Sequence, residues 1–405
     1  MPSRPDRRLQ IIFFTVLLDL LGFGIIIPLL PFYAKDLGAD ALTVGMLSTA
    51  YSLAQLSSSG AWGRLSDRVG RRPVLLGTIA FSAVAMLIFG LAESLTVLFI
   101  SRLLAGVAAG NIGAAQAYIA DITAPSERAK GMGMIGAAFG LGFIFGPAVG
   151  GPLFQIHHMA PGLAASALAV LNLLLAYRFL PESHPRHTGV SAAGETAPTP
   201  PDLQPSLKEA LALPGVGAVI SLFFIQNAGF SVLHTVFSLS SARLFGLDQT
   251  HIGYLFAYIG FFAVLVQGGL IGRLSKLFAA NRLTAGGLAL LTLAMVVVGL
   301  APSIPFLLVG LGMVGFGNGV ATPALSGLLS QRVAASNQGT LLGIAQAAGS
   351  LGRIVGPLMG GYVYDQHGPR TPYLMAAGVL SLATLLAITD VLKHHDVPAG
   401  RPSHR

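Results

Sequence analysis

Asp19 is the residue whose type and position most directly suggest chemistry. It is the only charged side chain in residues 9–33, and it lies about 10 residues into that apolar stretch. A carboxylate at the centre of a membrane helix costs about 2.5–3.5 kcal/mol on insertion scales, so intramembrane acids are rare and usually functional. Desolvation favours the protonated acid and a nearby cation favours the carboxylate. We therefore predict that Asp19 binds and releases protons; a fixed ion pair and a substrate-binding anion are the alternatives.

Two arginines also lie deep inside apolar stretches. Arg102 falls 6 to 8 residues inside the stretch 96–120, and Arg353 falls inside the stretch 338–364. Arg102 is too deep to be an ordinary loop charge, although a long side chain can extend outward to the membrane surface. A structural hydrogen-bonding role is its alternative. For Arg353 a substrate-facing role and a packing role are equally open.

Uncharged polar and aromatic side chains inside the apolar stretches are candidates for a substrate cavity. Amides in such positions either bond neighbouring helices or orient a ligand, and aromatic rings supply apolar walls. Both roles stay open for each residue. The candidate cavity residues are Phe23, Gln55, Asn111, Gln116, Gln226, Asn227, Phe230, Tyr258, Gln267, Asn318, Gln346 and Arg353.

Other kinds of site find no support in the sequence. The absence of cysteine excludes disulfides and thiolate metal sites. No Walker loop occurs, so ATP is not expected to drive the protein directly. The pairs His157–His158 and His394–His395 are adjacent residues outside the apolar stretches, without metal-ligand spacing. We expect no metal, no cofactor and no enzymatic activity, and a proton gradient as the energy source.

The composition places these residues in a membrane protein. Hydrophobic residues make up 53% of the 405 residues, and charged residues only 10%, against roughly a quarter in soluble domains. A helix needs about 20 mostly apolar residues to cross the hydrocarbon. Such stretches predict an all-α protein of twelve transmembrane helices, near residues 9–33, 42–62, 74–92, 96–120, 131–154, 161–181, 214–242, 250–272, 283–301, 304–329, 338–364 and 371–391.

Lysine and arginine predict the orientation, because they concentrate in cytoplasmic loops. With the N-terminus in the cytoplasm, 19 basic residues fall inside and only Lys35, Arg243 and Arg370 fall outside. This bias predicts a multi-pass protein with both termini cytoplasmic. It also accounts for the net charge of +8 without any nucleic-acid partner.

The two halves of the chain repeat each other at an offset of about 207 to 210 residues. Residues 17–23 match 224–230, and residues 146–151 match 356–361. Parallel repeats of this kind are typical of transporters whose halves move around a site near the midplane. The repeat therefore indicates alternating access.

The repeat and the composition also divide the chain. Residues 183–209 are rich in Pro, Ser, Thr and Ala, which is typical of a flexible linker. We predict an N-terminal six-helix half at 1–182, a cytoplasmic linker at 183–209 and a C-terminal six-helix half at 210–405, related by pseudo-symmetry.

Small residues recur at matching points of the two halves. Four-residue spacing puts them on one helix face, where backbones can approach closely; tight packing and a gating interface are both compatible with it. Proline adds a kink in each half. The residues are Gly142, Gly146, Pro147, Gly150 and Gly151 in the first half, and Gly352, Gly356, Pro357 and Gly360 in the second.

The loop after the second span carries a cluster of charges and glycines. Asp67 can accept hydrogen bonds from a helix N-terminus, and Arg68, Arg71 or Arg72 can pair with Asp121 or Glu127 near the end of the fourth span. Such contacts predict a cytoplasmic gate, with membrane anchoring by positive charge as the alternative. The expected gate residues are Gly63, Arg64, Asp67, Arg68, Gly70, Arg71, Arg72 and Asp121.

These motifs resemble those of the major facilitator superfamily. Residues 63–73 resemble its signature loop, residues 142–151 resemble the motif of its proton-driven antiporters, and Ser101–Gly106 resembles the span-four motif of the same exporters. The resemblance covers nearly the whole chain and is closest to the tetracycline efflux pumps and their multidrug relatives. It implies that Arg102 lies near the first span, where we expect it to respond to the charge on Asp19.

The sequence departs from tetracycline pumps at three positions. Ala85 replaces a carboxylate in span three, Ala263 replaces a histidine in span eight, and residues 283–299 contain no acid. The resemblance therefore extends to export in general rather than to tetracycline itself.

The expected protein is a proton-coupled antiporter in a bacterial cytoplasmic membrane, working as a monomer. It exports small lipophilic compounds or drugs by alternating access. A uniporter or proton symporter for a small metabolite and a membrane sensor without transport are the alternatives. Its expected partners are a small-molecule substrate, protons and the lipid bilayer.

Overall fold

The computed structural model describes residues 7–123, 127–184, 215–333 and 337–393. Within these ranges the chain forms helices and no strands. The predicted linker, 183–209, falls mostly outside the described residues, so its boundaries stay a prediction.

The helices follow the predicted spans closely. The first half contains α1 (Arg7–Ile26), α2 (Leu30–Asp36), α3 (Ala41–Val69), α4 (Arg71–Gly90), α5 (Leu95–Ala109), α6 (Ile112–Ile122), α7 (Arg128–Ile156) and α8 (Ala160–Phe179). The second half contains α11 (Val216–Phe245), α12 (Gln249–Leu265), η2 (Val266–Leu270), α13 (Ile271–Leu277), α14 (Ala280–Leu300), α15 (Ile304–Arg332), α16 (Gln338–His367) and α17 (Thr371–Lys393).

Three predicted spans are not single α-helices. The first divides into α1 and α2 around Pro28, which has no backbone N–H to continue the helix. The fourth divides into α5 and α6 at Gly110–Asn111. The eighth passes through η2, a π-helical turn that begins at Val266.

Eleven helical segments of the described chain are long and apolar enough to cross a membrane. They match every predicted span except the second. That span corresponds to α3, which carries Gln55, the serines 57–59 and the charges of Arg64, Asp67 and Arg68.

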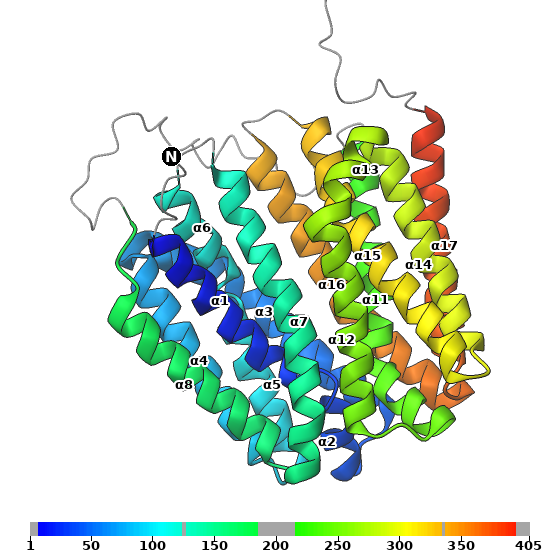
Figure 1. The fold of residues 1–405 in the computed structure, drawn as a ribbon, viewed down its shortest axis with the longest axis horizontal. Helices are drawn as coiled ribbons and strands as arrows, with labels where there is room; N and C mark the ends of the chain where they lie inside the picture. Colours follow the sequence, from blue (N-terminus) through cyan, green and yellow to red (C-terminus); the bar gives the residue numbers. More distant parts are fainter. Residues whose placement is uncertain (1–6, 124–126, 185–214, 334–336, 394–405) are drawn as a thin grey trace, which may run out of the picture. The chain divides into compact units, whose positions relative to one another are not determined.

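Contacts divide the chain into two compact units. The first holds residues 1–39, 47–197 and 247–257, and the second holds residues 40–46, 198–246 and 258–405. In the first unit α1 packs on α7 and α8, and α4 packs on α5 and α8. Figure 1 shows α1, in blue, crossing α7, in teal.

The core of the first unit lies among α1, α4, α6 and α7. Ile12, Leu75, Ile79 and Tyr118 are fully buried in it. The backbones of α1 and α7 are in direct contact, because Gly24 of α1 faces Gly146 of α7. A Cβ atom on Gly146 would lie only 2.6 Å from the Cα atom of Gly24.

The second unit repeats this packing. In it α11 packs on α16 and α17, and α14 packs on α15 and α17, so that α14 and α15 lie side by side (Figure 1). Here a Cβ atom on Gly356 would lie 2.2 Å from the carbonyl oxygen of Ala228. The predicted close approach at the spaced glycines is confirmed in both units.

Candidate functional site

The carboxyl group of Asp19 lies between α1 and α4. It is half-buried and takes a side-chain hydrogen bond from Ser82 of α4. In the described chain, no ion pair includes Asp19. A membrane acid held by a hydroxyl alone is not fixed in the charged form as a salt-bridged acid is. That Asp19 binds and releases protons stays a prediction.

Arg102 does not pair with Asp19. Its side chain is 3% exposed, its guanidinium lies 4.6 Å from the centre of the Phe89 ring, and it donates to the Ser101 hydroxyl at 3.3 Å. Phe89 follows Ser82 by seven residues on α4, which is about 10 Å of helix. Arg102 and Asp19 therefore contact α4 at different depths. That Arg102 responds to the charge on Asp19 stays a prediction.

One nitrogen atom of the Arg102 guanidinium has no hydrogen-bond partner among the described residues. This atom, Nε, is buried, although buried donors are normally paired. The cation–π contact with Phe89 stabilises the charge without satisfying this donor. A role in which Arg102 gains a partner in another conformation is compatible with the geometry.

Aromatic side chains surround the stretch of α1 after Asp19. Phe23 stacks on Tyr51 of α3 with ring centres 5.1 Å apart and meets Phe143 of α7 edge-on at 6.3 Å. Sequence reasoning identified Phe23 but missed Tyr51 and Ser82. Both are common residue types in apolar stretches, and only the fold brings them to α1.

The three predicted amides of the first unit differ in position. Asn111 is buried and donates to the Thr78 hydroxyl at 2.9 Å, so it joins the α5–α6 junction to α4. Gln55 donates to the carbonyl oxygen of Ala109 at 3.2 Å. Gln116 is exposed. Asn111 and Gln55 therefore make the inter-helix bonds that were their alternative role.

The predicted polar residues of the second unit form two small networks. Gln226 of α11 is 3% exposed and donates to Asn318 at 3.1 Å and Thr322 at 3.0 Å, both on α15. Beside it, Arg353 of α16 donates to Asn227 at 3.1 Å and to Ser350 at 2.7 Å.

The remaining predicted cavity residues lie on helices of the same unit. Phe230 meets the ring of His234 at 4.7 Å, and Tyr258 meets Phe262 at 5.0 Å. Gln267 is exposed on η2, and π-helical turns often occur at functional sites. Gln346 is exposed on α16.

The expected charged loop is helical except for Gly70, because α3 runs to Val69 and α4 begins at Arg71. Its charged residues form a network within the first unit. Arg71 binds Asp67 at 2.5 Å, Asp121 at 3.2 Å and the Ser66 hydroxyl at 2.6 Å. The predicted contact between Arg71 and Asp121 is therefore made. That Asp67 reaches another helix N-terminus, and that the loop works as a gate, stay predictions.

Glu182, which sequence reasoning missed, holds the start of α4 near the end of α8. Its carboxylate accepts the backbone N–H groups of Arg71, Arg72, Ser183 and His184 at 2.8–3.1 Å. Burial raises the pKa of Glu182, but these four hydrogen bonds lower it by more, so the pKa lies below its usual value. Gly70 has a φ of +102°, and a Cβ atom there would lie 2.5 Å from the carboxylate, so only glycine fits.

Known proteins share this arrangement of helices and motifs. The family profile of the Major Facilitator Superfamily matches residues 12–295 and 219–404, which together span nearly the whole chain. The chain belongs to the major facilitator superfamily. Within this superfamily it is similar to the tetracycline resistance protein, class C, of Escherichia coli, with 32% identity over 89% of the chain and 90% of the relative.

Two further proteins of this kind are similar to the chain over almost its whole length. Multidrug resistance protein 2 of Bacillus subtilis is 32% identical over 95% of each chain. The crystal structure of the human organic anion transporter MFSD10 (TETRAN) has a TM-score of 0.71 and 25% identity, covering 95% of this chain and 100% of that one. The chain is therefore an all-α, multi-span membrane transporter of small molecules with the major facilitator fold, and the predicted resemblance is confirmed.

Proposed function

We propose that this transporter exports small lipophilic compounds in exchange for protons, by alternating access of its two halves. The proton gradient supplies the energy. Two similar proteins, a tetracycline resistance protein and a multidrug resistance protein, support this substrate class.

The observation that carries the proposal is the setting of Asp19. It lies in the middle of α1, bonds Ser82, and forms no ion pair within the described residues. Protonation neutralises it at no cost in broken salt bridges. A change of charge in the first helix of the bundle gives protons a way to favour one conformation over another, because a ligand shifts an equilibrium by its differential affinity for the two states.

The arginines and lysines support an orientation with both termini on the cytoplasmic side. Two bacterial relatives support a position in a bacterial cytoplasmic membrane. The network of Arg71, Asp67 and Asp121 then lies on the cytoplasmic side, where its opening and closing would control access to the cavity.

Proteoliposome transport tests the proposal. Wild type and Asp19→Asn are compared in vesicles with an imposed pH gradient, with a tetracycline, a lipophilic cation and a lipophilic organic anion as substrates. Asp36→Asn is the matched control, because Asp36 is an exposed acid at the end of α2. We expect gradient-driven transport by wild type and the control, and none by Asp19→Asn.

Other results would identify the alternatives. Equal transport by Asp19→Asn rejects proton coupling at this acid. Accumulation of a metabolite in the direction of proton flow indicates a symporter, and transport without any gradient dependence indicates a uniporter. Binding without flux indicates a sensor.

Organic anions are a second candidate substrate class. Arg353 is a cation inside an apolar bundle, where it donates to Asn227 and Ser350, and one similar structure is named an organic anion transporter. Guanidinium groups bind carboxylates in a planar, two-point geometry that lysine does not reproduce. If Arg353 binds such a group, Arg353→Lys weakens transport of the organic anion and leaves transport of the lipophilic cation unchanged.

A further inference from the structure

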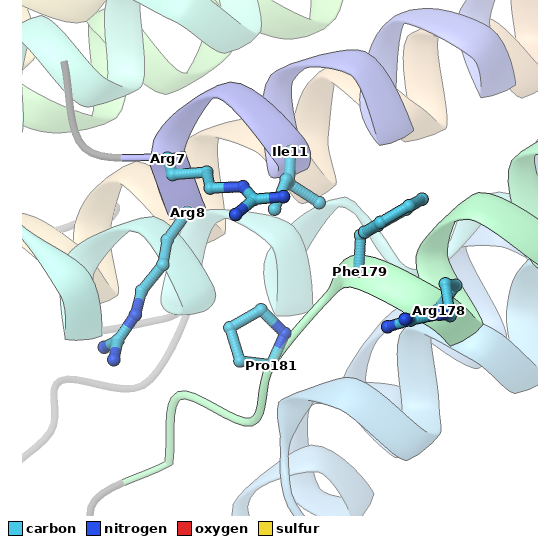
Figure 2. Close-up of a pocket in the computed structure, with 6 residues that line it drawn as sticks. All are labelled: Arg7, Arg8, Ile11, Arg178, Phe179 and Pro181. Carbon is cyan, nitrogen blue, oxygen red and sulfur yellow. The ribbon is translucent and has the colours of Figure 1, made fainter.

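A basic hollow lies where α1 begins and α8 ends. It has a volume of about 530 Å³ and is lined by Arg7, Arg8, Ile11, Arg178, Phe179 and Pro181. Figure 2 shows Arg7 and Arg8 on α1 and Arg178 on α8, with Pro181 between the two helices. A second hollow of about 300 Å³ shares Arg178, Phe179 and Pro181 with it. We call the first hollow the arginine pocket.

The arginine pocket has a strong positive charge. Three of its six lining residues are arginines and none is acidic. Arg7 and Arg178 form no ion pair with any described residue. The guanidinium of Arg178 lies 5.4 Å from the centre of the Phe179 ring, which holds it in place through a cation–π contact. The pocket therefore suits an anion with several oxygen atoms, such as a phosphate group.

The surroundings of the pocket suit a lipid rather than a free ion. The last turns of α8 expose apolar side chains, with Leu174 at 61% and Tyr177 at 67%. Both α1 and α8 are apolar enough to span the membrane, so their ends lie at the level of the headgroups. An acyl chain can follow the exposed face of α8 while the headgroup phosphate meets the arginines. Basic pockets at the ends of membrane helices bind anionic headgroups by this combination.

The described residues at the matching place of the second unit, near the start of α11 and the end of α17, show a different arrangement. There Arg332 binds Asp390 and donates to the carbonyl oxygen of Gly215 at 2.9 Å. The positive charge is thus balanced within the protein. At the arginine pocket of the first half, by contrast, Arg7 and Arg178 form no such ion pair with the described residues.

We propose that the arginine pocket binds the phosphate headgroup of an anionic phospholipid, in the leaflet where α1 begins. Arg7, Arg8 and Arg178 contact the phosphate oxygens, and the exposed face of α8 contacts the acyl chains. The site would anchor the start of α1, the helix that carries Asp19.

Native mass spectrometry of the full chain tests this assignment. The ratio of affinities for phosphatidylglycerol and phosphatidylcholine is measured for wild type and for Arg7→Gln/Arg8→Gln/Arg178→Gln. Each basic residue near the membrane surface contributes about fivefold to anionic lipid binding, so the triple variant should lose most of the preference. Arg7→Lys/Arg8→Lys/Arg178→Lys keeps the charge and should keep most of it.

A matched control separates the pocket from a general charge effect. Arg273→Gln/Lys276→Gln/Arg282→Gln removes three exposed basic residues from α13 and α14, and it should leave the preference unchanged. The proposal is overturned if the pocket variant keeps the wild-type preference, or if the control loses as much. Displacement of phosphatidylglycerol by millimolar inorganic phosphate would show a free-phosphate site and overturn the lipid assignment. Equal melting temperatures establish that every variant is folded.

Discussion

The first helices of the two halves carry different polar groups at the same point of the repeat. Asp19 of α1 corresponds to Gln226 of α11. Asp19 is half-buried and bonds the Ser82 hydroxyl on α4. Gln226 is buried and bonds Asn318 and Thr322 on α15.

The difference indicates a division of roles between halves of the same design. Both helices pack closely on glycines of the partner helix, so the two halves share this backbone packing. One half places an ionisable group in this frame and the other a permanently neutral amide. Under the proposed function, protonation of Asp19 changes the charge of the first half, while Gln226 holds a network of hydrogen bonds in the second.

Exchanging the two polar groups gives the largest expected effect. Asp19→Gln should reduce proton-driven transport to the background level, because no ionisable group remains at this point. Adding Gln226→Glu should not restore it, since the new acid faces Asn318 and Thr322 rather than Ser82. Transport in proteoliposomes under a pH gradient measures both. Recovery in the double variant would mean that the two halves are interchangeable.

The shared glycine frame gives the next largest effect. Gly146→Ala and Gly356→Ala each place a Cβ atom within 2.6 Å of the facing backbone, and overpacking of this kind costs about 1–3 kcal/mol. Both should lower the melting temperature in detergent by similar amounts.

The same helices provide controls. Gly136 on α7 and Gly343 on α16 have no atoms within 4 Å of an added Cβ atom. Gly136→Ala and Gly343→Ala should be neutral or slightly stabilising, because alanine favours a helix by about 1 kcal/mol. A loss of stability in only one of the two tight variants would show that the frames differ.

Removal of the amide network should have a moderate effect. Gln226→Leu breaks two hydrogen bonds from α11 to α15. Single polar contacts between membrane helices contribute about 0.6 kcal/mol and at most about 1.7 kcal/mol. We expect a lower melting temperature, whereas Gln346→Leu, at an exposed position, should change it little. Unchanged stability in Gln226→Leu would assign the amide to ligand binding instead.

The smallest effect concerns the matching acids at the ends of the two halves. Glu182 binds four backbone N–H groups, whereas Asp390 binds the side chain of Arg332. The pKa of Glu182 lies below its usual 4.5, so its stabilisation is present above that pH and is lost as pH falls through the lower folded-state pKa.

Glu182→Gln should therefore cost about 1 kcal/mol at neutral pH, and the cost should shrink in acid below 4.5. Thermal unfolding at neutral and acid pH measures it, with exposed Glu93→Gln as the control. A cost that does not depend on pH would contradict a role for the carboxylate charge.

Much of the fold could be predicted because membrane helices leave a local pattern. Apolar stretches matched the helices within a few residues, and the spacing of Gly146 and Gly356 predicted the close packing. The break at Pro28 was missed because proline is tolerated within membrane helices as well as at their ends. The position of Arg102 against Phe89 could not be predicted, because depth within a bundle depends on how helices slide along each other.

The sequence by itself determined the membrane spans, the duplicated halves, the family and the presence of one acid deep in the first span, because hydropathy and motifs are properties of neighbouring residues. Only the tertiary structure decided that Asp19 meets Ser82, that Arg102 lies on Phe89, and that Gln226 reaches Asn318. Those contacts join residues far apart in the chain. They depend on the rotation and depth of each helix, which packing fixes and composition does not.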